Sequence, residues 1–258
     1  QRRMDTGHLS KEQVTGIGIG VPGPVLNENI VQGCVNLGWG NVRVADELSA
    51  LTGLKVKAAN DANVAALGEQ WQGGGKGFQN LVMFTLGTGV GGGIIQNGRI
   101  ISGANGAAGE IGHMTVNPGE TQPCSCGKWG CLEQYASAGG IVRLAQAAGL
   151  RVESAKDVSD LAAWGNERAQ GALKKAGRLL GLALSNAACL VDVDGILLGG
   201  GVAAAGEALL SPVRDAFYAN VFHAAAGTQV ALASLGNDAG MYGAARLALG
   251  SQSATTAL

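Results

Sequence analysis

Charge is scarce in this sequence, and neither sign predominates. Only 14% of the 258 residues are charged, and 18 lysines and arginines stand against 19 aspartates and glutamates. Nucleic-acid-binding proteins carry a clustered surplus of basic side chains, so we expect no nucleic-acid partner for this domain. Long apolar runs are lacking as well. The longest candidate, 179–191, falls short of the roughly 20 apolar residues that span a bilayer, so we expect no membrane partner.

The patterns of a signal peptide and of a disulfide framework are also missing. The sequence opens with Gln1-Arg2-Arg3 and continues into polar residues rather than an apolar segment. It has five cysteines, an odd number, and three of them fall within eight residues. This spacing favours metal binding in a reducing compartment over disulfide bonds, and we expect a cytoplasmic protein.

Glycine is abundant instead, at 44 residues, far above the usual share of about 7%. The glycines lie between apolar runs, which predicts tight turns and close approaches of backbone to a ligand. Short strands and helices alternate along the chain, as in α/β proteins with parallel strand pairing. The predicted strands are 15–21, 54–59, 81–86, 94–96, 99–102, 195–198 and 230–232. The predicted helices are 46–52, 60–71, several within 135–186, one from about 202, and 239–249, and residues 103–131 are expected to be irregular.

Three cysteines and one histidine form the most specific pattern. Cys124, Cys126 and Cys131 lie close together, and His113 precedes them by a short loop. Three thiolates and one imidazole complete a tetrahedral zinc shell and leave no position for water, so we expect a structural rather than a catalytic metal. The alternative is three free buried thiols. Cys34 and Cys189 lie in apolar surroundings, where a core role is expected.

Two glycine-rich stretches favour a nucleotide ligand. Residues 87–92 match the pattern G-x-G-x-x-G, but β-like residues and an Asn-Gly turn follow, so the stretch does not open a Rossmann helix. A glycine hairpin can still offer backbone N–H groups to a phosphate, although a purely structural hairpin is the alternative. Residues 199–201 form a second stretch between a predicted strand and a helix, where ligands bind in α/β folds.

Acidic and amide side chains accompany these patterns. Asn60 and Asp61 fall where a strand meets a helix, and Glu110 and Glu133 flank the cysteines. Such groups accept hydrogen bonds from hydroxyls, and a carboxylate beside a phosphate donor can take a hydroxyl proton. Singly, each is equally explained as a surface acid or a helix cap.

Together these motifs resemble the ROK family of sugar kinases and related regulators, and within it the bacterial glucokinases. The resemblance runs from residue 15 to 249, and its cysteine signature is far more specific than its glycine stretches. The matching segments are GIGVPGPV at 18–25, NDAN at 60–63, LGTGVGGG at 86–93, GEIGH at 109–113, CxCGxxGCxE at 124–133 and LGGGV at 198–202.

The resemblance implies a two-domain, actin-like ATPase (ribonuclease H-like) α/β fold with a cleft between the domains. It implies an ATP-dependent hexokinase, most similar to a glucokinase, that uses Mg²⁺ with ATP and carries a structural zinc on the Cys₃His set. Asp61 would be the general base for the sugar 6-hydroxyl. The implied sugar-binding residues are Gly23, Asn36, Asn60, Asp61, Gly89, Glu110, His113 and Glu133. The implied nucleotide-binding residues are Gly87, Thr88, Gly89, Gly91, Gly92, Gly199, Gly200 and Gly201.

The family's first phosphate motif, Asp-x-Gly-Gly-Thr, does not occur before residue 15. We therefore expect residues 1–60 to be the rest of a small domain that lacks its first strands. Residues 61–237 would form the large domain with the zinc loop, and 238–258 a returning helix and tail. Without that motif the chain should bind sugar better than it phosphorylates it. The alternatives are a sugar-sensing transcriptional regulator, or a kinase for fructose, N-acetylglucosamine or N-acetylmannosamine. The family also implies a homodimer.

Overall fold

The N-terminal part of the chain folds into two small sheets and one helix. The computed structural model describes residues 10–34 and 37–250. Strand β1 (Ile17–Val21) pairs in parallel with β5 (Val56–Asn60), and α2 (Val44–Thr52) precedes β5 in the chain. These three elements confirm the predicted strand, helix and strand. Beside them, β2 (Val25–Leu26), β3 (Ile30–Cys34) and β4 (Trp39–Arg43) form an antiparallel sheet that the sequence pattern did not reveal.

The larger part of the chain is built on a five-stranded sheet with the order β10-β9-β6-β7-β8. Strands β10, β9 and β6 are parallel, whereas β6, β7 and β8 form an antiparallel meander. The parallel strands place the carboxyl ends of β6 and β9 at the same edge of the sheet. The bounds are β6 (Leu81–Leu86), β7 (Val90–Gln96), β8 (Arg99–Ile100), β9 (Gly195–Gly199) and β10 (Gln229–Leu232).

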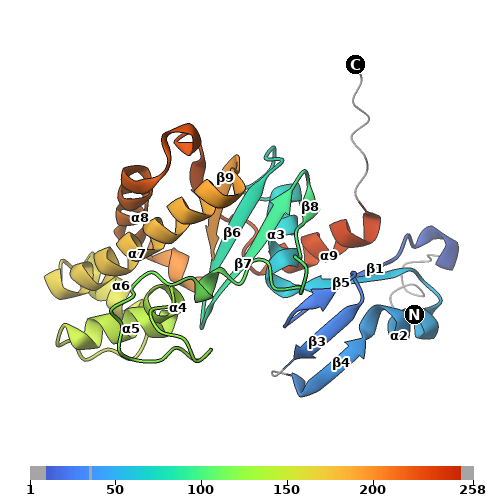
Figure 1. Ribbon diagram of the computed structural model, residues 1–258, viewed down its shortest axis with the longest axis horizontal. Helices are drawn as coiled ribbons and strands as arrows, with labels where there is room; N and C mark the ends of the chain where they lie inside the picture. Colours follow the sequence, from blue (N-terminus) through green and yellow to red (C-terminus); the bar gives the residue numbers. More distant parts are fainter. Residues whose placement is uncertain (1–9, 35–36, 251–258) are drawn as a thin grey trace.

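Helices cover both faces of this sheet (Figure 1). Alternate residues of β6 explain why, because Val82, Phe84 and Leu86 point into one apolar core while Leu81 and Met83 point into another. The first core is closed by α4 (Glu133–Ala136), α5 (Ala138–Ala147), α6 (Ala155–Ala163), α7 (Glu167–Val191) and α8 (Glu207–Asn220). The second core is closed by α3 (Asp61–Gln72) and α9 (Ala239–Leu249).

Helices α3 and α9 approach each other closely at two glycines, Gly68 and Gly243. A methyl group at Gly68 would come within 2.1 Å of the Ala239 carbonyl oxygen, and one at Gly243 within 1.7 Å of the Val64 carbonyl oxygen. Only glycine permits this approach. The contact seats α9 against the helix whose first residue is Asp61.

Two predicted boundaries were wrong. Strand β7 begins at Val90 rather than at residue 94, because glycines 91–93 pair with β6 and leave room for α3 and for Ile111. The glycine stretch at 199–201 leads into a 3₁₀ helix (Gly201–Ala205), and α8 begins only at Glu207. Within residues 10–34 and 37–250, no helix is long and apolar enough to cross a bilayer.

Candidate active site

Asp61 is the first residue of α3, directly after β5. The helix begins here because the Asn60 side chain caps it: Oδ1 accepts hydrogen bonds from the amides of Ala62 (3.0 Å) and Asn63 (3.3 Å). The Asn60 Nδ2 donates to the Gly23 carbonyl oxygen at 3.2 Å, which joins two predicted sugar-site residues. The Asp61 side chain is exposed, and one of its carboxylate oxygens accepts from the Ala62 amide at 2.8 Å. The second oxygen is available to a hydroxyl proton.

The connection between β6 and β7, residues 87–89, is called the glycine turn here. The Gly87 amide donates to the Gly89 carbonyl, and the Gly87 carbonyl accepts from Ala138. In the part of the chain that the structure describes, the amides of Thr88 and Gly89 have no acceptor and are free to bind an anion. Gly91 and Gly92, also predicted to bind nucleotide, lie near the start of β7. A methyl group on Gly91 would lie 3.5 Å from Ala62, so the strand runs beside the start of α3.

Glu133, the first residue of α4, connects the glycine turn to the cysteine loop (residues 114–132). Its Oε2 accepts from the Val90 amide at 3.1 Å, and its Oε1 accepts from the Ser125 hydroxyl at 3.2 Å. A methyl group at Gly89 would come within 2.5 Å of Oε2, so a larger residue there would displace the Glu133 carboxylate. Glu133 thus lies against the same turn as the anion-binding amides. Ser125 was missed by the sequence analysis, because a serine beside a cysteine carries no signal of its own.

The predicted metal ligands converge. One ligand atom each from His113, Cys124, Cys126 and Cys131 lies within 4.8 Å of the other three. The Sγ atoms of Cys126 and Cys131 are 3.7 Å apart, and Cys124 Sγ is 3.9 Å from His113 Nδ1. Ligand atoms around a tetrahedral zinc with Zn–S distances of about 2.3 Å lie about 3.8 Å apart, so this donor set fits zinc.

The other nitrogen of His113 faces an acidic residue. His113 Nε2 lies 4.0 Å from Glu110 Oε2, and Glu110 precedes the 3₁₀ helix Ile111–His113. A carboxylate beside the second nitrogen of a metal-bound histidine orients the imidazole ring. The predicted sugar residues Glu110 and His113 therefore share one short turn beside the cysteine loop.

The thiols differ in their surroundings. Burial, above all, raises the pKa of Cys131 to about 12, and the neighbouring thiols of Cys126 and Cys124 add to this. A hydrogen bond from the Lys128 backbone lowers the pKa of the exposed Cys126. The Lys128 ammonium also donates to the His113 carbonyl at 3.0 Å, which holds the two ends of the loop together.

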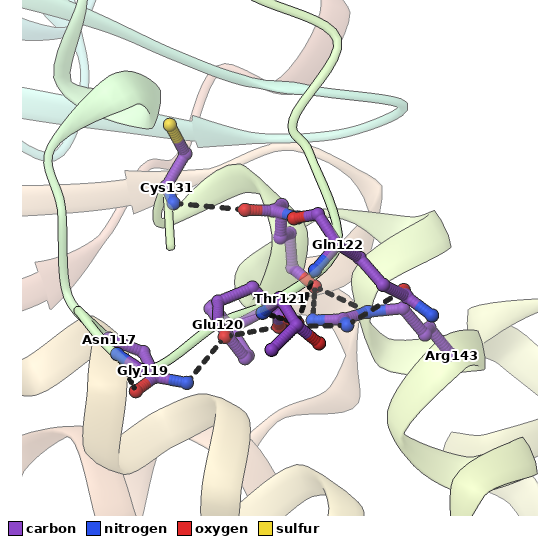
Figure 2. A network of polar contacts seen from close by, with 9 residues as sticks. Asn117, Gly119, Glu120, Thr121, Gln122, Cys131 and Arg143 are labelled. Carbon is purple, nitrogen blue, oxygen red and sulfur yellow. Dashed lines mark hydrogen bonds and ion pairs between the residues drawn. The ribbon is translucent and has the colours of Figure 1, made fainter. Parts of the chain in front are cut away.

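A polar network anchors the cysteine loop from the opposite side (Figure 2). Glu120 accepts hydrogen bonds from the Tyr135 hydroxyl and from Arg143, the latter at 2.9 Å. Arg143 also donates to the Gln134 carbonyl at 3.0 Å, and Gln134 Oε1 accepts from the Cys131 amide at 3.1 Å. The network therefore fixes the start of α4, where Glu133 lies, to α5. The sequence analysis missed it, since its members are ordinary surface residue types.

Glu120 makes this network sensitive to acid. The Tyr135 hydroxyl, the Gln122 amide and Arg143 lower its pKa from 4.5 to about 2. Because the folded-state pKa is depressed, the stabilisation is complete above about pH 4.5 and is lost as the pH falls toward 2. Linkage gives a loss of about 2 kcal/mol between pH 6 and pH 3. Between pH 6 and pH 3, the free energy of unfolding should therefore fall by about 2 kcal/mol more in the parent protein than in Glu120→Gln, as measured by urea titration. Equal losses in the two proteins would contradict this role of Glu120.

The second glycine stretch lines a cavity of about 430 Å³ at the carboxyl end of β9, called the nucleotide cavity here. Gly199, Gly200 and Gly201 form one wall, and residues 232–233 and 236–237 form the opposite wall. A methyl group at Gly200 would come within 2.3 Å of the Leu86 carbonyl oxygen, so this wall adjoins the glycine turn. The structure thus brings the two predicted nucleotide stretches together. The remaining predicted residue, Asn36, lies outside the described residues.

The chain is similar to known sugar kinases and to a transcriptional regulator. The chain is 42% identical to a glucokinase of Halalkalibacterium halodurans, over 94% of this chain and 78% of that protein. The structure of a ROK family glucokinase from Streptomyces griseus, in complex with glucose and AMPPNP, superposes with a TM-score of 0.76. It is 35% identical, over 90% of this chain and 80% of that chain. A ROK family transcriptional regulator superposes with a TM-score of 0.83 at 28% identity, over 96% of this chain and 65% of that chain.

The fold is therefore that of the actin-like ATPase class, as found in sugar kinases. The ROK family model matches residues 5–251, and the chain belongs to the ROK family. The predicted fold class and family are both confirmed.

Proposed function

We propose that this protein transfers the γ-phosphoryl group of ATP to the 6-hydroxyl of a hexose, with glucose as the preferred acceptor. The observation that carries the proposal is the placement of Asp61 beside the strand that leaves the glycine turn, where the Thr88 and Gly89 amides are free to bind an anion. Glucokinases among the relatives support glucose over other sugars.

In this mechanism Asp61 accepts the proton of the sugar 6-hydroxyl as the hydroxyl oxygen attacks the γ-phosphorus. The bond from the γ-phosphorus to the bridging oxygen of the β-phosphate breaks, and ADP leaves. Phosphoryl transfer depends mainly on positioning and on stabilisation of charge. The amides of Thr88 and Gly89 hold phosphate oxygens, and Mg²⁺ entering with ATP neutralises part of the charge. The adenosine moiety occupies the nucleotide cavity. The remaining sugar hydroxyls bind the other proposed sugar residues: Gly23, Asn36, Asn60, Gly89, Glu110, His113 and Glu133.

We also propose a structural zinc on His113, Cys124, Cys126 and Cys131. The ligand distances support it, and a closed Cys₃His shell leaves no position for a reacting water. The ion would hold the cysteine loop against Glu133 and take no part in proton or phosphoryl transfer. All five cysteines are free, which supports a reducing compartment such as the cytoplasm. The domain division at residues 60/61 and 237/238 and the homodimer stay predictions.

The test combines calorimetric sugar binding with a coupled ATP assay on glucose, fructose, N-acetylglucosamine and N-acetylmannosamine. We expect glucose to give the highest kcat/KM. A different preferred hexose would correct the substrate and keep the reaction. Sugar binding without any binding of ATP or ADP would favour a sugar-sensing regulator, which the regulators among the similar proteins make the second candidate.

Glu133→Gln separates binding from chemistry. The carboxylate holds the glycine turn and faces the sugar side, but it does not accept the transferred proton in our mechanism. We expect the KM for glucose to rise about tenfold, as for loss of one charged hydrogen bond, while kcat changes less. Glu167→Gln is a matched control, since Glu167 is the exposed first residue of α7. A fall in kcat with unchanged KM would argue for a chemical role of Glu133.

A further inference from the structure

Glu69 is a buried carboxyl group that the proposed mechanism does not use. It lies in the third turn of α3 and is 0% exposed. Every hydrogen bond that it accepts within the described residues comes from a backbone amide. Buried carboxyl groups are rare unless they are paired, so this arrangement calls for a role.

The three amides come from two separate loops. Oε2 accepts from Gly74 at 2.8 Å, in the loop that follows α3. Oε1 accepts from Leu235 at 2.7 Å, and both oxygens accept from Ser234 at 3.1 and 3.0 Å. Ser234 and Leu235 lie about 165 residues further along the chain, in the segment after β10. A carboxylate suits this position because it offers acceptors only.

The segment held by Glu69 is the far wall of the nucleotide cavity. Ala233, Gly236 and Asn237 line the cavity opposite the glycines 199–201. Ser234 and Leu235 lie between these lining residues. The carboxylate therefore fixes the middle of the wall from behind.

Close contacts restrict the position of this wall on both of its sides. A methyl group at Gly199 would lie 3.1 Å from the Ala233 side chain, so the two walls meet closely at the base. On the other side, a methyl group at Gly73 would come within 2.9 Å of the Leu235 side chain and within 2.0 Å of Glu69 Oε2. A small displacement of the segment would thus change the shape of the cavity.

We propose that Glu69 is a positioning residue for the adenine nucleotide: it sets the wall of the nucleotide cavity through the amides of Ser234 and Leu235. The inference rests on the proposed function, which places the nucleotide in this cavity. Helix α3 then serves both substrates, with Asp61 at its first residue and Glu69 two turns later.

The test is Glu69→Gln, which replaces one acceptor oxygen by an NH₂ group facing an amide donor. We expect the KM for ATP and the calorimetric Kd for ADP each to rise about tenfold, because a buried donor loses its acceptor. The KM for glucose and kcat should stay within about twofold of the parent values. Gln70→Ala is the matched control. Among the residues that the structure describes, the Gln70 side chain bonds only the Phe78 carbonyl, at 2.8 Å, so its loss loosens the same helix end without touching the cavity wall.

The outcomes separate the two proposals. Unchanged ADP affinity in Glu69→Gln, with ADP binding in the parent, overturns the positioning role and leaves the proposed function intact. Equal rises in KM for ATP and glucose, or the same ATP effect in Gln70→Ala, would show a general structural role and also overturn it. Absence of nucleotide binding in the parent instead overturns the proposed function. If Glu69→Gln fails to fold, Glu69→Asp, which keeps the charge but is shorter by one methylene, is measured in the same way and judged by the same results.

Discussion

Replacing Asp61 by asparagine is expected to lower kcat by at least about 100-fold, with little change in glucose affinity. The amide keeps the shape of the side chain and its bond to the Ala62 amide, but it cannot accept the hydroxyl proton. The loss should therefore fall on the chemical step. The measurement is a coupled assay at saturating ATP, with glucose binding followed separately by calorimetry.

Asp46→Asn supplies the matched control. Asp46 is an exposed aspartate in the first turn of α2, so the same charge is removed from the start of a helix. It should leave kcat unaffected. Turnover of Asp61→Asn within about tenfold of the parent would assign the proton to another group.

Cys131→Ala is expected to remove the zinc and to lower glucose affinity by at least about tenfold. Cys131 is fully buried and lies two residues before Glu133, so the loss of this ligand should release the end of the cysteine loop nearest the sugar. ADP affinity should change far less, because the nucleotide cavity is formed by other segments. Metal analysis of the parent should give about one zinc per chain.

Cys189→Ala is the control for this change, since Cys189 is an exposed thiol on α7 and the prediction that it lies in the core was wrong. It should retain both the metal and the sugar affinity. A Cys131→Ala variant that keeps one zinc per chain, or a parent protein without metal when it is purified in the absence of chelators, would contradict the proposed zinc site.

Local patterns were sufficient to predict the parts of the fold with strong periodicity. The cap at Asn60, the strand that follows residue 80 and the last helix at Ala239–Leu249 all lie where the pattern places them. The sequence pattern did not predict strands β2–β4, because they are short. The turn that joins β2 to β3 places Asn27 and Glu28 in the left-handed region of backbone conformation, which few sequence rules predict. Glycines 91–93 were assigned to a loop, yet they form a strand because α3 packs against them.

The metal ligands could be predicted because residues of metal-binding types lie close together along the chain. Glu69 and Glu120 could not be, since what distinguishes them is their partners rather than their neighbours. Glu69 bonds Ser234 and Leu235, more than 160 residues away, and Glu120 bonds Arg143 across a turn and a helix. Such contacts exist only once the sheet and its helices are assembled.

The contact of α3 with α9 restricts how the sequence can change over time. At Gly68 and Gly243 a side chain of any kind would collide with backbone, so selection at these positions acts on volume alone and is indifferent to chemistry. Substitution of the exposed Asp61 carries no such collision with backbone. A change of chemistry at Asp61 can therefore leave this helix contact intact, and proteins similar to this chain include both a glucokinase and a putative xylose repressor.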